Sequence, residues 1–281
     1  MKPFIAIALG VLMVMSLPVG SVSAETKDAF GRTSNHVLSD SDEERIVDHF
    51  DQTILTWKGS DAKIHKWKGH FAVVMDPDEF HEHFNRVRFY VSQASVILRP
   101  LYLFGFSSTR EYKKSNQIRI IMGDSVDYVL DKYKGFLQEF PEKNKEKYYD
   151  TARIGLNLGS DCVVQYVFED EWIVRSTILI KNKDLNKNFP EKCFWSSFYN
   201  AIGMLGNRKG PDLESIVDLD SSRRNPNTLD NISIFMLYNS RLEAGLDRKT
   251  VLPLLRQLLR DDPGVVAYVE SSMRRSKRLG R

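Results

Sequence analysis

The chain has 281 residues, a formal net charge of +3 and 42% hydrophobic residues, which is typical of a globular protein long enough to build a sizeable core. A net charge this small does not indicate a nucleic-acid partner. Cys162 and Cys193 are the only cysteines, which excludes a disulfide-dense scaffold.

The first 24 residues have the order of a secretory signal peptide. Lys2 precedes an apolar run over residues 4–15, and Val22-Ser23-Ala24 has the small-x-small pattern of a cleavage site. The apolar run is too short to span a bilayer, which takes about 20 residues. We therefore expect cleavage after Ala24, a periplasmic or secreted protein, and no transmembrane segment.

The next part of the chain predicts helices that alternate with strands. Residues 25–40 are polar and predict a disordered leader, after which Ser41-Asp42-Glu43-Glu44 has capping-box spacing ahead of a helical apolar stripe. The sequence "HFAVVM" (70–75) predicts a strand, and Asp76-Pro77-Asp78 begins a helix that Pro100 ends. Further elements are expected in this order: strands at 101–106 and 117–122, then a helix at 125–140 that Pro141 and a lysine-rich patch close.

The remaining elements complete one predicted α+β domain over residues 41–262. Two apolar strands flank Glu169-Asp170-Glu171 as a hairpin, and a helix follows at about 189–204, with Asn188 as its predicted N-cap. Two more helices are expected near 229–238 and 248–260. The sheet is expected to be mixed and mostly free of crossover connections. Residues 263–281 predict a solvated basic tail, with contact to anionic lipid as the alternative; its cations are Arg274, Arg275, Lys277, Arg278 and Arg281.

The two cysteines predict one disulfide in an oxidising compartment. A bond between Cys162 and Cys193 would stabilise the fold by roughly 3–4 kcal/mol on the chain-entropy model, which is itself disputed. The alternatives are a catalytic thiol or a pair of metal ligands. Neither cysteine has the CxxC spacing or the nearby ligand-spaced histidine that those alternatives require.

The segment "CFWSSFYNAIGMLG" (193–206) has the frame of a metalloprotease helix without its ligands. In the metzincin pattern HExxHxxGxxH, three histidines hold zinc, the glutamate acts as general base and the glycine turns the chain. With Gly203 aligned to that glycine, the ligand positions are Ser196, Asn200 and Gly206. The base position is Ser197.

This segment resembles an uncharacterised family of exported proteobacterial proteins, a domain of unknown function that is zincin-like in outline and carries C-L-x-E-E-x-x-Q-x-L-G-L-x-N-D. The matching positions are Cys193, Phe194, Ile202, Gly203 and Met204, with Asn200 in place of the glutamine. The chain departs from the motif at the carboxylate pair, where it has Ser196 and Ser197, and at Gly206 and Asn207.

Other segments in the same order resemble that family over roughly residues 60–255. They are "IHKWKGHFAVVM", "SNQIRIIM", "DCVVQYVFEDEWIVRSTILI" and "SIVDLD…TLDNISIFMLYNSRLEAGL", in which Leu237-Tyr238-Asn239-Ser240-Arg241-Leu242 stands for a leucine-tyrosine-aspartate-proline-arginine-leucine motif. The resemblance implies a zincin-like α+β fold with a degenerate active-site helix at about 189–204.

The missing ligands determine the expected function. Serine hydroxyls, an amide and a glycine do not form a zinc site and do not activate water. We expect no metal, no cofactor and no catalytic residue, and a protein of the cell envelope that binds a peptide or an envelope component in the residual cleft. The alternatives are an envelope hydrolase with active residues outside this helix, and a structural partner subunit whose cleft is filled.

Other candidate residues have simpler interpretations. His81 and His83 lie two residues apart, so they point away from each other on a helix and are expected at a solvated helix start. His65 and His70 are expected at the surface, with an acidic partner as the alternative. Ser196 and Ser197 lack the sharp turn and the neighbouring histidine that a nucleophile requires. The tryptophans Trp67, Trp172 and Trp195 are expected in the core.

Overall fold

The computed structural model describes residues 38–56, 63–75, 81–98, 104–108, 116–138, 144–183, 189–206, 215–217 and 223–278. The expected signal peptide, most of the expected leader and Asn188 lie outside these ranges. The strands are β1 (Lys66–Trp67), β2 (Phe71–Met75), β3 (Phe104–Ser108), β4 (Gln117–Gly123), β5 (Cys162–Glu169) and β6 (Trp172–Lys181). The helices are α1 (Asp40–Ile54), α2 (His81–Leu98), α3 (Val126–Leu137), α4 (Lys145–Asn157), α5 (Glu191–Ala201), α6 (Thr228–Leu237), α7 (Arg248–Asp261) and α8 (Gly264–Arg278).

The strands form one mixed sheet within an α+β fold. Strands β6, β4, β2 and β3 are parallel neighbours in that order, and β5 pairs antiparallel with β6 at the edge of the described sheet. Parallel neighbours need crossover connections, and α2 lies between β2 and β3 in the chain. The expectation of a mixed sheet is therefore confirmed, whereas the expectation that the sheet is mostly free of crossovers is wrong.

The short strand β1 comes just before β2 in the chain and pairs with β6, whereas β2 pairs with β3 and β4. β5 pairs with β6 along one edge, including the positions Trp172 and Ile173 that also pair with β1. Strand β6 has two edges and β5 occupies one of them, so β1 must lie on the other. This is the edge of β6 that pairs with β4 from Arg175 onward. β1 therefore extends past the beginning of β4 and reaches β6.

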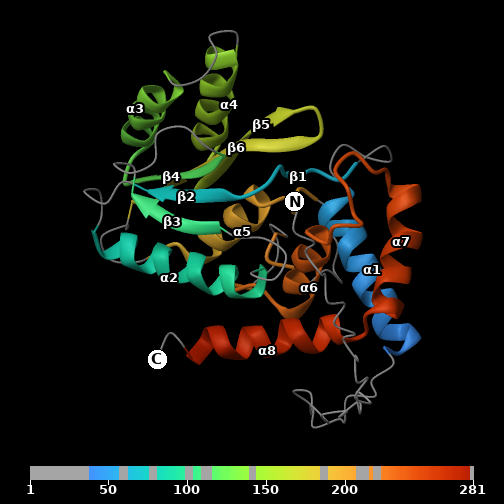
Figure 1. Cartoon of the computed structure of the whole chain (residues 1–281). Helices are drawn as coiled ribbons and strands as arrows, with labels where there is room; N and C mark the ends of the chain where they lie inside the picture. The colour runs from blue at the N-terminus through green and yellow to red at the C-terminus, as the bar shows by residue number, and fades with distance from the viewer. Residues whose placement is uncertain are drawn as a thin grey trace, which may run out of the picture.

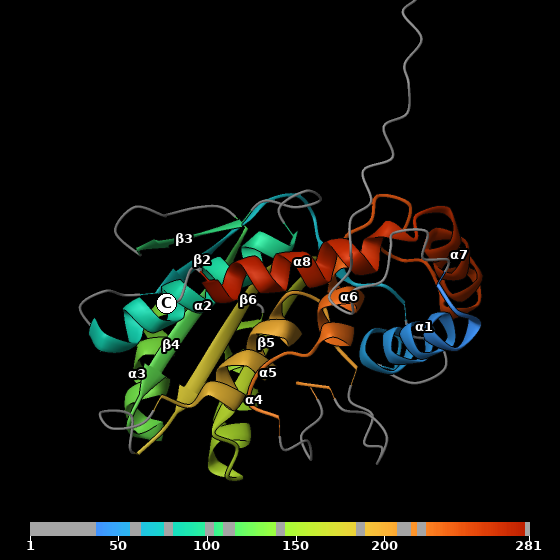
Figure 2. The same ribbon diagram turned by 90° about the horizontal axis from the view of Figure 1, so that it is seen from below.

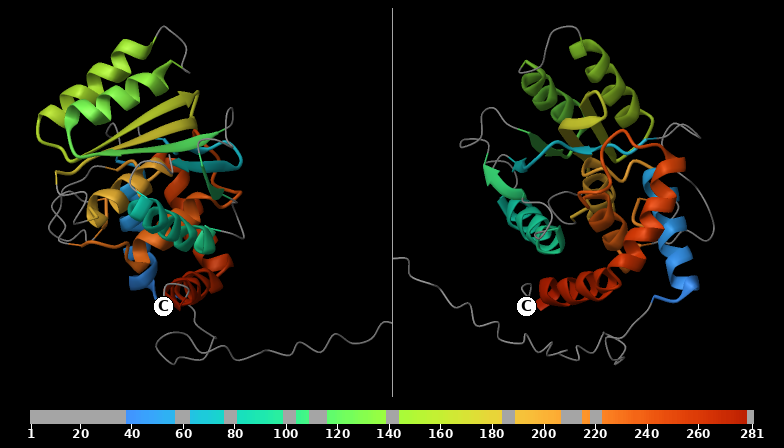
Figure 3. Two further views of the ribbon diagram at one scale, coloured as in Figure 1. Left: turned by 90° about the vertical axis from the view of Figure 1, so that its left-hand side faces the viewer. Right: turned by 45° about the vertical axis from the view of Figure 1, so that its right-hand side comes forward.

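Helices cover both faces of the sheet (Figures 1 and 3). Helices α3 and α4 pack on one face, while α5 and α2 contact the other. Helix α8 crosses α2 and α6 on the side away from the sheet, as Figure 2 shows, and α1 packs against α6 and α7. None of the described helices combines the length with the hydrophobicity that a bilayer span requires.

Alternation along the strands divides the buried side chains into two cores. On β4, Ile120 and Met122 join the large core on the α5 face, while Ile121 joins the small core under α3 and α4. On β6, Ile178 and Leu179 divide in the same way. Successive side chains of a strand point to opposite faces, so the apolar run Ile120-Ile121-Met122 supplies both cores at once.

Several predicted elements are confirmed with shifted ends. The strand at 70–75, the strand at 117–122 and the hairpin around Glu169-Asp170-Glu171 correspond to β2, β4 and β5–β6. The predicted N-cap Ser41 is wrong, because Ser39 holds that position and its Oγ accepts a hydrogen bond from Asp42 N at 3.1 Å. Helix α4 was not predicted.

The end of the described chain differs from the expected solvated tail. Residues 264–278 form helix α8, which buries Val265, Val269, Ser272 and Ser276. Two apolar residues spaced one turn apart are a short signal for a buried helix face, and the many cations of this segment obscure it. Arg274 and Arg275 lie on the exposed side of the helix.

Lys66 in β1 closes the carboxyl end of α6. Its buried Nζ donates to the carbonyl oxygens of Leu237, Asn239 and Leu242 at 3.4, 3.3 and 2.5 Å. Carbonyls at the end of a helix have no partner within the helix and carry its negative partial charge. Burial lowers the pKa of Lys66 to about 8, and the charge of Glu243 opposes this shift.

We expect Lys66→Met to lower the free energy of unfolding by about 1–3 kcal/mol at neutral pH, because buried carbonyls lose their donor. The variant should also lose the pH dependence of the unfolding free energy that Lys66 causes. Since the pKa of Lys66 is about 8 in the folded protein and 10.5 for a free lysine, the unfolded chain binds more protons between these pH values, and wild-type stability gains with rising pH. Urea unfolding of both proteins from about pH 7 to about pH 10 measures the gap between their unfolding free energies, which should widen as the pH rises. A gap that stays constant across this range contradicts the prediction.

Candidate functional site

Helix α5 has one aromatic face in the core and one polar face. Phe194 and Phe198 stack with ring centroids 5.8 Å apart and are fully buried. Trp195 and Tyr199 are buried beside them. Side chains three and four residues apart share a helix face, so the positions between these aromatic residues, Ser196 among them, point elsewhere.

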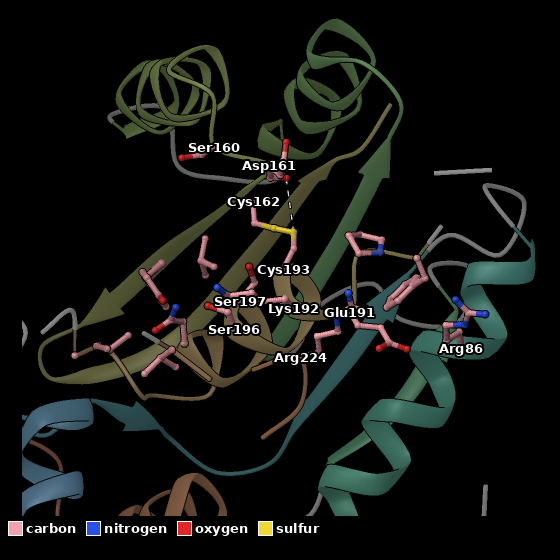
Figure 4. A pocket seen from close by; sticks show the side chains of 18 residues that line it. Arg86, Ser160, Asp161, Cys162, Glu191, Lys192, Cys193, Ser196, Ser197 and Arg224 are labelled. Atoms are coloured by element: carbon pink, nitrogen blue, oxygen red, sulfur yellow. Dashed lines mark hydrogen bonds between the residues drawn. A yellow bond between two sulfur atoms is a disulfide. The ribbon is translucent and has the colours of Figure 1, made fainter. Parts of the chain in front are cut away.

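A cavity of about 1140 Å³ lies between this polar face and the inner face of β5 (Figure 4). Side chains of β5 alternate, so Cys162, Val164 and Tyr166 line the cavity, while Val163 and Val167 pack toward α3 and α4. The other lining residues are Arg86, Ser160, Asp161, Phe189, Pro190, Glu191, Lys192, Cys193, Ser196, Ser197, Asn200, Leu205, Gly206, Val217 and Arg224. The size is that of a site for a small ligand or a short peptide segment.

The predicted disulfide is confirmed and joins the two walls of the cavity. Cys162 is the first residue of β5 and Cys193 lies in the first turn of α5, with Cα atoms 5.9 Å apart. This separation is within the range that a disulfide spans. Figure 4 shows the bond at the end of the cavity where Ser160 and Asp161 lie. The disulfide therefore fixes the helix beneath the edge strand.

Replacing both cysteines by serine should lower the free energy of unfolding by about 2–4 kcal/mol, since the unfolded chain regains the freedom of the closed loop. It should also loosen the wall that β5 forms. Denaturant unfolding measures the first effect, and amide hydrogen exchange along β5 measures the second. Wild-type protein kept under reducing conditions should behave as the double variant does. Faster exchange in β4 and not in β5 would contradict the assigned role.

Four of the five metzincin-frame positions line the cavity. Ser196 and Asn200 are one helical turn apart and half-buried, and Ser197 is buried beside them. Gly206 also lines the cavity, while Gly203 follows the end of the helix with a φ of +115°. Hydroxyl and amide groups at these positions can hydrogen-bond a ligand but are not the donors that zinc requires.

The backbone of α1 fills the space beside Gly206. Gly206 N donates to Thr53 O at 2.6 Å, and a Cβ added at Gly206 would lie 2.6 Å from Thr53 Cα and collide with Gln52 O. A side chain at this position therefore has no room. The third ligand position of the frame could not be restored by substitution without moving α1.

Charged side chains gather where the first turn of α5 meets α2. Arg86 from α2 and Arg224 from the segment before α6 line this part of the cavity, together with Lys192 and Glu191 of α5. Glu191 Oε1 accepts a hydrogen bond from Tyr90 at 2.5 Å. Burial, and next the hydrogen bond to Glu191, raise the pKa of the Tyr90 phenol far above its ordinary value.

The histidines take structural positions. His65 lies 3.4 Å from Glu171 Oε2, so the alternative of an acidic partner holds, whereas His70 is exposed as expected. His83 is buried with its ring 5.5 Å from that of Phe189, so the expected solvated position is wrong for this residue. None of the described residues that line the cavity is a histidine, and the described residues hold no group of three side chains suited to a metal ion.

A second set of residues has the types of a serine-hydrolase triad but lies in the interior. His49 Nδ1 is 2.8 Å from Ser233 Oγ, and His49 Nε2 is 3.2 Å from Asp230 Oδ1. All three side chains are buried, and none lines the cavity. Ser233 is fully buried, and this arrangement connects α1 to α6.

The sequence indicated the polar face of α5 but missed most other residues around the cavity. Val164 and Tyr166 could have been inferred from Cys162, because alternate residues of a strand share a face. No local pattern marks Arg86 or Arg224, since each lies far along the chain from α5. No protein-family model, curated protein or solved structure matches this chain.

Proposed function

We propose that this protein is an exported, non-catalytic binding protein that holds an extended peptide in the cavity between β5 and α5. We further propose that its fold is zincin-like and that its metal site has been lost. The observation that carries the proposal is the cavity itself, because Ser196, Ser197 and Asn200 line it where a metzincin would have two imidazoles and a carboxylate.

The edge position of β5 favours a peptide as the ligand. Within the described sheet β5 pairs only with β6, so the main chain along its other edge can pair with an extended segment. Main-chain pairing supplies affinity, and side-chain pockets supply selectivity. The serine and asparagine side chains of α5 face the same cavity and can bond peptide amides. An open cavity also argues against a structural subunit whose cleft is filled.

A bulky substitution tests the proposal directly. Ser196→Trp should place a bulky side chain in the cavity beside Ser197 and Asn200 and block binding of a random octapeptide pool, measured by fluorescence anisotropy with the disulfide-intact protein. Ser92→Trp is the matched control, because Ser92 is an exposed helix residue outside the cavity. Binding that Ser196→Trp leaves intact would refute the cavity as the site.

Two further measurements separate the alternatives. Cleavage of the pool that persists after alanine replaces Ser196, Ser197 and Asn200 would favour an envelope hydrolase. One equivalent of zinc in the purified protein would overturn the proposed loss of the metal site.

A further inference from the structure

We infer that the cavity selects a peptide carrying a carboxylate, either its C-terminus or an acidic side chain, and that Arg86, Lys192 and Arg224 receive this group. The inference rests on the proposed function and names the class of peptide that the cavity binds. It follows from three cationic side chains that reach one cavity from three separate parts of the chain.

The three cations come from α2, from the first turn of α5 and from the segment before α6. The Arg86 guanidinium lies 5.5 Å from the ring centroid of Phe189, two residues before α5 begins. Lys192 is in the first turn of the helix. Arg224 lines the same cavity from the segment before α6, and Figure 4 labels it below Lys192 and Glu191. All three cations therefore line the cavity together with the first turn of α5.

The cationic side chains that line the cavity outnumber the carboxylates that line it. Glu191 Oε1 accepts a hydrogen bond from the hydroxyl of Tyr90, so one of its oxygens is already engaged. Asp161 is exposed, and its Oδ1 lies 4.0 Å from Nζ of Lys181. The described residues that line the cavity thus include three cations and two carboxylates. A concave site focuses such a field on the ligand more than a flat surface does.

The rest of the cavity favours a peptide over a purely charged ligand. Val164, Leu205 and Val217 provide apolar lining, and Tyr166 lies beside Val164 on the inner face of β5. Burial raises the pKa of the Tyr166 phenol, so this side chain stays neutral. Apolar walls together with a few polar groups and a charged end suit one short segment with an acidic group.

Two peptide pools test the inference. One random octapeptide pool contains a single Asp or Glu and has a free C-terminus; the other has Asn or Gln instead and is amidated. We expect the acidic pool to bind at least about tenfold more tightly at low salt, as for a charge-assisted hydrogen bond, and this preference should shrink as salt is added. Pools that carry only one of the two changes distinguish a C-terminal carboxylate from an acidic side chain.

Charge-neutral variants test whether Arg86 and Arg224 receive the carboxylate of the peptide. Arg86→Gln combined with Arg224→Gln should abolish the preference for the acidic pool. Arg88→Gln should leave it unchanged, because Arg88 is an exposed arginine of α2 outside the cavity. A preference that survives the double variant would overturn the assignment to these arginines.

The outcomes separate this inference from the proposed function. If both pools bind equally and Ser196→Trp still abolishes binding, the inference fails while the proposed function stands. If neither pool binds the folded wild-type protein, both fail. If vesicles of phosphatidylglycerol bind through Arg86 and Arg224 and Ser196→Trp does not affect them, an anionic surface replaces the peptide as the ligand.

Discussion

Asp230→Ala should lower the free energy of unfolding by about 4 kcal/mol or more, since it removes the acceptor for several buried donors at about 1–3 kcal/mol each, with partial relaxation. Ser215 Oγ donates to Asp230 Oδ1 at 2.5 Å, and the backbone N–H groups of Ile216 and Asn227 donate to Oδ2 at 3.1 and 2.9 Å. His49 Nε2 lies 3.2 Å from Oδ1. Asp230 is fully buried, so water cannot replace the lost acceptor.

The same carboxylate is connected to the cavity wall. Asp230 and Asn227 form the capping box of α6, and the next residue, Asn231, accepts a hydrogen bond from Tyr199 of α5 at 2.6 Å. Val217 follows the segment that Asp230 holds and lines the cavity. We therefore expect peptide affinity to fall together with stability in Asp230→Ala.

Asp247→Ala is the matched control for this prediction. Asp247 is the exposed N-cap of α7, and its carboxylate accepts a hydrogen bond from Thr250 N at 2.9 Å. Losing one exposed cap should cost about 1 kcal/mol. Urea unfolding of both variants gives the comparison. Equal losses in the two variants would show that the buried network adds nothing beyond an ordinary helix cap.

Gly203→Ala should lower the free energy of unfolding by about 3–5 kcal/mol, because it combines backbone strain with a steric collision. Gly203 has a φ of +115°, which residues with a side chain rarely adopt. A Cβ at this position would lie 2.8 Å from both His65 O and Leu237 Cδ2. One of these atoms belongs to the backbone beside β1, so relief requires movement of the chain.

The collision would displace the end of α5 and the segment that follows it. Trp67 Nε1 donates to Ala201 O at 2.9 Å, and Tyr238 Oη donates to Ile202 O at 2.8 Å. These bonds hold the turn in which Gly203 lies. Leu205 and Gly206, just beyond this turn, line the cavity. The substitution should therefore weaken peptide binding as well as stability.

Gly159→Ala separates strain from collision. Gly159 has a φ of +97° but nothing within 4 Å of an added Cβ. Gly159→Ala should therefore lower the free energy of unfolding by the strain energy alone, about 1–2 kcal/mol. Thermal and urea unfolding of the two alanine variants measures the difference. If Gly159→Ala is as damaging as Gly203→Ala, contact with β1 and α6 is not what makes Gly203 necessary.

Local patterns in the sequence predicted elements well. Elements that depend on contacts distant in the chain were missed. The hairpin of β5 and β6 was predicted because apolar strands flank three acidic residues. Helix α4 was missed because it is mostly polar and buries only Ala152 and Leu156. Contact with α3 and β5 stabilises this helix, and those contacts depend on residues far from it in the chain.

Residue types and short spacings were enough to predict the pairing of Cys162 with Cys193, the place of α5 after the hairpin, and the lack of imidazole and carboxylate groups in residues 193–206. These features depend on residue type and on spacing within a few turns. Four other features became visible only in the folded chain: the parallel order of the strands, the burial of Asp230, the docking of α8 and the presence of Arg86 and Arg224 at one cavity. Each of these brings together residues distant in the chain, and packing of the two cores sets which of them meet.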